Sequence, residues 1–220
     1  TFKEYVEKDI PVICFTISLI FSGSYNSAMN AKGLIEEEYP DAKIYIIDTK
    51  QNTVTQALII DQTVRMRDAA LPLEKALDKI QKVIDSARIF FTVGSLDYLQ
   101  MGGRIGKVAA AASKIDVKPV IIMKDGDISL GGIGRNRNKL KKKVLAVADK
   151  YLTEKGKDNF IVSVGYGYDA AEGVSFMNEL EETLGIKLQS ETNAAIGIVS
   201  GVHTGPHPIG LGCVQKYETL

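Results

Sequence analysis

The stretch Leu19-Ile-Phe-Ser-Gly-Ser-Tyr-Asn-Ser-Ala28 joins an apolar segment to a helical one, and this junction decides the fold class. The segment before it, Val12-Ile-Cys-Phe-Thr-Ile-Ser18, is a continuous apolar run, which is typical of a strand covered on both faces. After the junction, Ala28, Ala31 and Ile35 recur at helical spacing. A buried strand followed directly by a helix predicts the first half of a βαβ unit.

The Ser22-Gly-Ser24 turn in this junction has two interpretations. Either serine is suited to cap the helix, which is what most serines in this position do. Alternatively, Gly23 lets the backbone approach a ligand closely, and the unpaired N–H groups and dipole of the helix start attract a carboxylate or phosphate. The junction alone leaves both interpretations open.

The first part of the chain continues with alternating strands and helices. Ala42–Asp48 and Arg88–Val93 are predicted strands, and Val54–Arg67 and Leu73–Ala87 are predicted helices. This alternation favours parallel βαβ units, which bind ligands at the carboxyl ends of their strands. Ser22 lies at such an end.

The pattern changes in the second part of the chain. Val117–Met123 and Ile128–Gly134 are predicted to form a hairpin around Asp125-Gly126, followed by a helix over Asn136–Lys155. A helix is expected over Ala170–Leu184, and further strands are expected at Phe160–Val164, Ile186–Ser190, Ala195–Ser200 and Leu211–Tyr217. The sequence therefore predicts an α/β protein with a parallel-sheet βαβ domain at residues 1–88, then an α+β domain with a mixed sheet at 89–220.

Composition excludes several classes of function. The 220 residues are 45% hydrophobic and 25% charged, and 27 Lys and Arg balance 27 Asp and Glu, so no overall field recruits nucleic acid. No apolar run reaches the length of a membrane-spanning helix. Cys14 and Cys213 form neither a disulfide framework nor a metal cluster, and they favour a reducing cytoplasm.

Polar chemistry concentrates in a few places. Both histidines lie in Gly201-Val-His-Thr-Gly-Pro-His207, which is predicted to be a shaped loop after an apolar strand. His203 and Thr204 are suited to bind an anion there, although a histidine held by loop hydrogen bonds is equally compatible. Arg104 and Arg135 each follow glycines and suit two-pronged carboxylate recognition, with a surface ion pair as the alternative.

Two enzymatic alternatives remain open. Ser22 and His203 could belong to a lipid hydrolase or acyltransferase, but no Gly-x-Ser-x-Gly motif and no third triad member is recognisable. A nucleotide- or phosphate-binding enzyme would need a longer glycine-rich loop than Ser22-Gly-Ser24 or Gly102-Gly-Arg104. The basic segment Lys139-Leu-Lys-Lys-Lys143 is typical of a solvated helix face, with an acidic docking partner as the minor interpretation.

Several motifs together resemble the DegV family. Ser18-Leu-Ile-Phe-Ser-Gly-Ser-Tyr-Asn-Ser-Ala28 is similar to that family's Ser-x-x-Leu-Ser-Gly-Thr-Tyr-x-x-Ala motif. Leu96-Asp-Tyr-Leu-Gln-Met-Gly-Gly-Arg-Ile105 resembles its Leu-x-Tyr-Leu-x-x-Gly-Gly-Arg-Ile segment, and His203-Thr-Gly-Pro206 resembles its His-Thr-Gly-Pro-Gly ending. The motifs occur in the family's order and span nearly the whole chain.

The resemblance implies a non-catalytic, cofactor-free, two-domain carrier of one long-chain fatty acid. It implies that residues 1–88 hold the acyl tail and that residues 89–220 close over the carboxylate at the domain interface. Ser22 and Gly23 match the family's carboxylate-binding turn, and His203 and Thr204 match its closing motif.

The resemblance also implies partners. Arg104 and Arg135 match family arginines near the ligand mouth or a partner contact. The expected partner is an ATP-binding fatty acid kinase subunit in the cytoplasm, and a transient contact with a membrane surface is compatible with this role. No nucleic acid or metal is expected.

The sequence departs from the family pattern in three places. Family members carry a further N-terminal segment with Asp-Ser and Thr-Ser-x-Pro motifs, so this chain resembles a shortened member. Val54-Thr-Gln-Ala57 stands where the family has a glycine-containing turn, and Pro206-His207-Pro208 stands where it has Pro-Gly. We expect these departures to alter the walls of the pocket.

Overall fold

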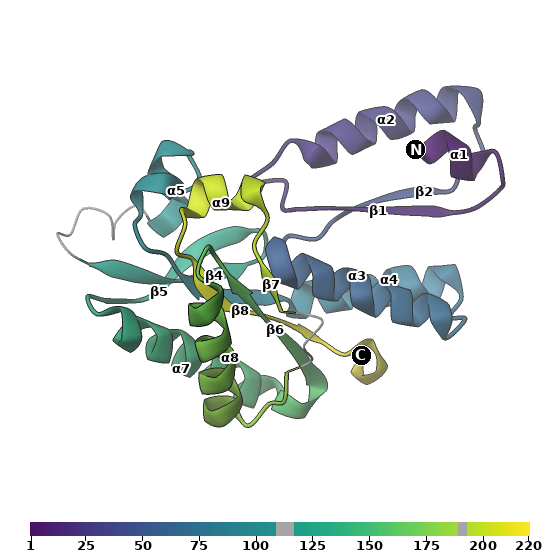
Figure 1. Cartoon of the computed structure of the whole chain (residues 1–220). Coiled ribbons are helices and arrows are strands. Elements are labelled where there is room, and N and C mark those ends of the chain that lie inside the picture. Colours follow the sequence, from purple (N-terminus) through teal and green to yellow (C-terminus); the bar gives the residue numbers. More distant parts are fainter. Residues whose placement is uncertain (109–116, 189–192) are drawn as a thin grey trace.

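The computed structural model describes residues 1–108, 117–188 and 193–220 and contains two β-sheets (Figure 1). The smaller sheet pairs β1 (Val12–Thr16) with β2 (Ile44–Asp48) in parallel, and α2 (Ser24–Glu38) connects them. This arrangement confirms the predicted βαβ unit. The apolar run predicted strands that are covered on both faces. The strands of this sheet are instead mostly half-buried.

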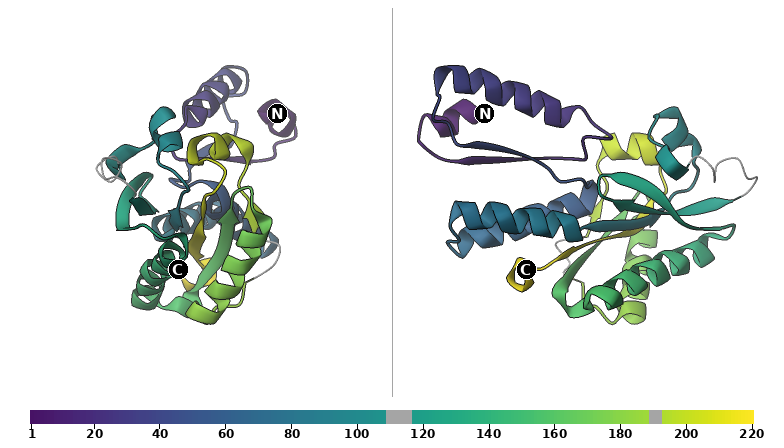
Figure 2. Two further views of the ribbon diagram at one scale, coloured as in Figure 1. Left: turned by 60° about the vertical axis from the view of Figure 1, so that its left-hand side comes forward. Right: turned by 180° about the vertical axis from the view of Figure 1, so that it is seen from behind.

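Helices lie on both sides of the smaller sheet (Figures 1 and 2). One side holds α2 with α1 (Phe2–Val6) beside it, and the other holds α3 (Thr53–Asp68) and α4 (Leu73–Ser86). Ile13, Phe15 and Ile47 of the strands pack against the apolar core of α3 and α4. The periodicity of Leu73–Ala87 predicted α4 correctly because its apolar face is buried in this core.

The larger sheet has six strands in the order β5-β4-β3-β8-β6-β7. Its members are β3 (Arg88–Thr92), β4 (Lys118–Lys124), β5 (Asp127–Gly134), β6 (Phe160–Tyr166), β7 (Ala194–Ala195) and β8 (Ile209–Gln215). Neighbouring strands are antiparallel except β6 and β7, which are parallel. The mixed sheet is therefore confirmed, and the hairpin turns at Asp125-Gly126 as predicted.

The two faces of the larger sheet are covered differently. One face packs against α7 (Arg137–Lys155) and α8 (Ala170–Leu184), where Phe90, Val120 and Phe176 belong to a closed apolar core. The opposite face meets α3 and α4 at one end and α5 (Asp97–Met101) with α9 (Ile198–Thr204) at the other. Short 3-10 turns occur at Gly106–Val108, Lys157–Asn159 and Tyr217–Thr219.

Hydrogen bonds tie the two sheets together. The buried Ser18 hydroxyl donates to the carbonyl oxygen of Gly126 at 2.6 Å, which links the end of β1 to the β4–β5 hairpin. The buried Gln51 amide nitrogen donates to the carbonyl oxygen of Ala87 at 3.0 Å, just before β3. Buried bonds between distant segments hold the β1–α2 junction in a fixed position over the larger sheet.

One open alternative is excluded, and two local predictions were wrong. The N-cap of α2 is Gly23 rather than a serine, and the Ser22 hydroxyl instead accepts from the Ser24 N–H at 3.2 Å. The expected strand at Ala195–Ser200 ends at Ala195, and α9 begins at Ile198, so His203 lies on a helix rather than in a loop. Residues 186–188 form no strand, and the rest of that predicted strand lies outside the described residues.

Candidate functional site

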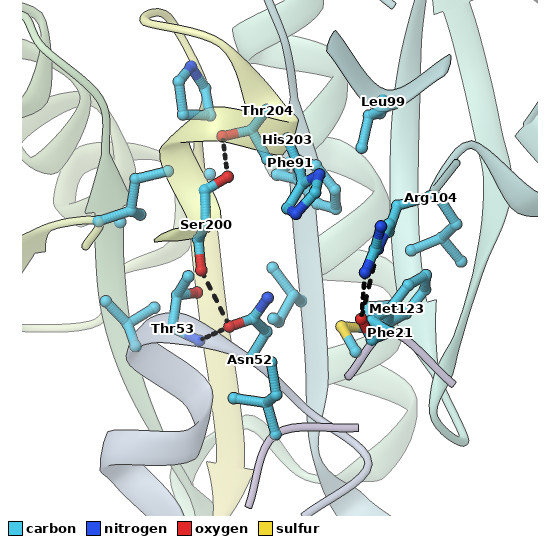
Figure 3. A pocket seen from close by; sticks show the side chains of 18 of the residues that line it. Phe21, Asn52, Thr53, Phe91, Leu99, Arg104, Met123, Ser200, His203 and Thr204 are labelled. Carbon is cyan, nitrogen blue, oxygen red and sulfur yellow. Dashed lines mark hydrogen bonds between the residues drawn. The ribbon is translucent and has the colours of Figure 1, made fainter. Parts of the chain in front are cut away.

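A pocket lies between the β1–α2 junction, the start of α3, helices α5 and α9, and one face of the larger sheet (Figure 3). The empty space between its walls, counted together with its opening to solvent, is about 1030 Å³. Most of its wall is apolar, and the residues that form this apolar part are Ile17, Phe21, Val54, Ile89, Phe91, Leu99, Met123, Ile128, Ile196, Val199, Pro208, Ile209 and Leu211. Residues from both parts of the sequence, 1–88 and 89–220, contribute to the lining.

Helix α9 supplies a polar stripe to this pocket. Ser200, His203 and Thr204 all line it, because residues three and four apart share one face of a helix. The Thr204 hydroxyl donates to the carbonyl oxygen of Ser200 at 3.1 Å. The remaining face of α9 is apolar and open to solvent, with Ile198 86% and Val202 64% exposed. One short helix thus separates the pocket from an exposed apolar surface.

The His203 imidazole is held by close packing against α5. A Cβ atom added to Gly102 would lie 2.1 Å from His203 Nδ1, so only glycine leaves room for the ring. His203 Nδ1 is buried and has no hydrogen-bond partner among the described residues. No described carboxylate therefore orients this ring through Nδ1, as the third member of a hydrolase triad would.

Arg104 anchors the opposite wall of the pocket. Its Nε and Nη2 atoms donate to the carbonyl oxygen of Phe21 at 3.3 and 3.2 Å, and Nη1 donates to the carbonyl oxygen of Gly102. Both acceptors are neutral, so the guanidinium charge stays available to an anion in the pocket. The same bonds fix the segment that carries Ser22 against the loop after α5 (Figure 3).

The start of α3 forms another part of the wall. A Cβ atom at Gly212 of β8 would lie 2.0 Å from the Thr55 hydroxyl, so α3 packs directly on the sheet backbone. This close packing brings Asn52 and Thr53 to the pocket. Asn52 caps α3, and its side-chain oxygen accepts from the Thr53 N–H at 2.8 Å and from the Ser200 hydroxyl at 3.2 Å (Figure 3).

The structure brings four of the six predicted site residues together. Ser22, Arg104, His203 and Thr204 all line the pocket, and each is half-buried. Gly23 adjoins Ser22 but is exposed and does not line it. Arg135 is also exposed and lies between β5 and α7, outside the lining.

Sequence reasoning missed three polar lining residues. Asn52, Thr53 and Ser200 carry no motif that distinguishes them from an ordinary helix cap and a helix serine. The one available signal was the Asn-Thr pair before the predicted helix at Val54, which indicates a cap but not what the cap faces. Ser200 was assigned to a strand, so its contact with Asn52 was not foreseen.

Glu172 and Cys213, which both lie outside the pocket, are among the groups whose pKa values are shifted. The pKa of Glu172 is lowered, chiefly because its carboxylate accepts two hydrogen bonds from Arg137 at 2.9 and 2.7 Å. Burial raises the pKa of the Cys213 thiol to about 12, so it is an inert core residue. No group of three or more potential metal ligands occurs among the described residues. No helix of the described part is both long and apolar enough to cross a membrane.

The fold and the pocket define a two-sheet α/β protein with a largely apolar site for a small ligand. A family model described as "Uncharacterised protein, DegV family" matches residues 1–216, and this chain belongs to the DegV family. A DegV domain-containing protein of Clostridium perfringens is 29% identical over 206 residues, which cover 93% of this chain and 69% of the relative.

Solved structures show the same fold. The chain is 70% identical to a stearic acid-binding protein from Eubacterium ventriosum, with a TM-score of 0.97 over 100% of this chain and 75% of that one. It also shares its fold with a fatty acid-binding DegV family protein from Thermus thermophilus, at 22% identity and a TM-score of 0.87 over 97% and 74% of the two chains. The expected family and fold class are therefore confirmed.

Proposed function

We propose that this chain binds a long-chain fatty acid, with the acyl chain in the apolar pocket and the carboxylate beside Ser22 and His203. The observation that carries the proposal is the meeting of Ser22, Arg104 and His203 in one largely apolar pocket. The 70% identity to a stearic acid-binding protein supports the same ligand class. Burial of the acyl chain contributes roughly 0.8 kcal/mol per CH₂ group, so the polar residues mainly set its orientation.

Each proposed head-group residue has a defined role. The Ser22 hydroxyl accepts from the Ser24 N–H, which leaves its own hydrogen free to donate to a carboxylate. Gly23 would present its backbone beside Ser22, His203 would donate from α9, and Thr204 would donate by turning its hydroxyl away from the Ser200 carbonyl. Arg104 would supply a positive charge. In this proposal both parts of the chain hold the tail, with most of the apolar lining coming from residues 89–220, which also close over the carboxylate.

The chain would act as a non-catalytic carrier that presents its ligand to a separate ATP-binding kinase subunit in the cytoplasm. The exposed Arg135 supports such a partner contact. The exposed apolar side chains of Ile198, Val199 and Val202 next to the pocket support a transient contact with a membrane surface during loading. No cofactor is needed for this role.

The test is native mass spectrometry of the purified protein before and after organic extraction. The expected result is a mass excess equal to one long-chain fatty acid, lost on extraction and restored by adding the acid. A fluorophosphonate probe addresses the hydrolase alternative, and we expect Ser22 to stay unlabelled. Absence of bound or rebound fatty acid, or stoichiometric labelling of Ser22, would contradict the carrier proposal.

A further inference from the structure

Asn52 presents a fixed amide group to the pocket. Its side-chain oxygen accepts from the Thr53 N–H at 2.8 Å and from the Ser200 hydroxyl at 3.2 Å. A backbone N–H can only donate, so the atom that it meets must be the oxygen, and this sets which way round the amide lies. The nitrogen end consequently points into the pocket (Figure 3).

The amide nitrogen of Asn52 has no acceptor among the described residues. Asn52 is half-buried, and the side chains around the pocket are mostly apolar. Once a ligand with an apolar tail displaces water from the pocket, this N–H group loses free energy unless the ligand supplies an acceptor. The acceptor is expected to come from whatever fills the pocket.

The backbone next to Asn52 is held in an unusual conformation. Thr53 has a φ of 46°, in the left-handed region that β-branched residues rarely adopt. Such strain persists where the surrounding structure enforces it, and it is common at binding sites. Here the strained residue is the one whose N–H orients the Asn52 amide.

Asn52 also lies on the same side of the pocket as His203. The Ser200 hydroxyl contacts Asn52, and Ser200 and His203 are three residues apart on α9, so they share one face of that helix. Ser200 and His203 are about one helical turn, roughly 5 Å, apart along α9. A ligand group beside His203 is therefore also near Ser200, which Asn52 contacts. A carboxylate has two oxygens and can accept from Asn52 and His203 at once.

We propose that Asn52 is a head-group binding residue whose amide nitrogen donates a hydrogen bond to the ligand carboxylate. This inference rests on the proposed function and names a residue that determines which head group the pocket selects. Hydrogen bonds to an ionised acceptor are about twice as strong as neutral ones. Asn52 accordingly favours an ionised fatty acid over the alcohol or ester of the same chain length.

The competing explanation is that Asn52 only caps α3 and holds α9 through Ser200. The substitution Asn52→Asp separates the two roles. An aspartate is as good an N-cap as asparagine, and its oxygens still accept from Thr53 and Ser200. It removes the donor that faces the pocket and puts a negative charge in its place.

The experiment measures the dissociation constants of hexadecanoic acid and hexadecanol at pH 7.5, after lipid extraction, for the wild-type chain and for Asn52→Asp. We expect the acid to bind the variant about 30-fold more weakly or worse, because the variant loses a hydrogen bond to a charged group and gains a like charge. The alcohol should change by less than about threefold. The matched control is Asn30→Asp on the exposed face of α2, which should change neither value.

Lowering the pH gives a second readout. Protonation of the introduced carboxyl restores a donor, so the acid should regain affinity for Asn52→Asp between pH 7.5 and 5 relative to the wild-type chain. Equal weakening of acid and alcohol, or no weakening of either, would overturn the role of Asn52. Failure of the wild-type chain to bind hexadecanoic acid would instead overturn the proposed function itself.

Discussion

Helices α2 and α7 show how differently the two parts of this protein are built. Helix α2 covers the smaller sheet and buries none of its side chains, whereas α7 fully buries Leu140, Val144 and Leu145 against the larger sheet. Buried apolar area is the main source of stability, so the larger sheet with α7 and α8 forms the stable body of the molecule. The pocket therefore lies between the less buried layer that carries the β1–α2 junction and the well-buried larger sheet.

The largest expected difference between the two parts concerns core packing. Phe176 of α8 is fully buried, and Phe176→Ala should lower the free energy of unfolding by about 3–5 kcal/mol through lost burial and a new cavity. Leu34 of α2 is 66% exposed, and Leu34→Ala should lower it by less than about 0.5 kcal/mol. Urea unfolding of both variants tests the comparison. Similar losses in the free energy of unfolding at both positions would contradict it.

The contribution of ion pairs to stability should also be larger in the part with α7 and α8 than in the part with α2. Glu172 is 19% exposed and contacts Arg137 at 2.7 Å and Lys141 at 3.8 Å, so Glu172→Gln leaves two cations poorly paired. We expect a loss of about 1–3 kcal/mol in the free energy of unfolding. The matched change Glu36→Gln affects the Lys32–Glu36 pair of α2, which is more exposed and should contribute about 0.5 kcal/mol or less.

The Glu172 pair also predicts a pH dependence. The pKa of Glu172 is lowered in the folded chain, so its stabilisation is present above the unfolded-state pKa of about 4.3 and is lost as the pH falls through the lower folded-state pKa. The stability gap between the wild-type chain and Glu172→Gln should therefore be constant from pH 8 to about 5 and narrow below about pH 4. A gap that widens in acid would contradict this assignment.

A third comparison separates effects on ligand binding from effects on folding stability. A methyl group at Gly102 would collide with the His203 ring, so Gly102→Ala should displace the imidazole and weaken fatty acid binding by about tenfold. Gly33 of α2 has open space around it, so Gly33→Ala should leave binding unchanged and raise stability by about 0.5–1 kcal/mol through helix propensity. Ligand titration and thermal unfolding of both variants provide the check. Unchanged binding by Gly102→Ala would mean that His203 does not contact the ligand.

The sequence predicted most of the regular elements because their patterns are local. The periodic apolar residues of α4 and the Asp125-Gly126 turn of the hairpin appear in the structure as expected. Helix α9 was missed because Ile198 and Val199 are β-branched and have strand-like local preference. A seven-residue helix has little stability of its own, and α9 forms where it packs against α5.

The candidate site was partly predictable for a related reason. Ser22 and His203 belong to recognisable motifs, so their presence in one pocket could be anticipated from the family resemblance. Asn52 could not be found in this way, because its importance depends on Ser200, which is 148 positions further along the chain. A cap residue and a pocket residue have the same local sequence, and only the packing of α3 on β8 distinguishes them.

The most direct test of the central claim is a crystal structure of this chain with octadecanoic acid bound. We expect the acyl chain to lie against Phe91, Met123 and Leu211, with the carboxylate within hydrogen-bonding distance of the Ser22 hydroxyl and the His203 ring. A ligand bound with its carboxylate away from both residues, or outside this pocket, would contradict it.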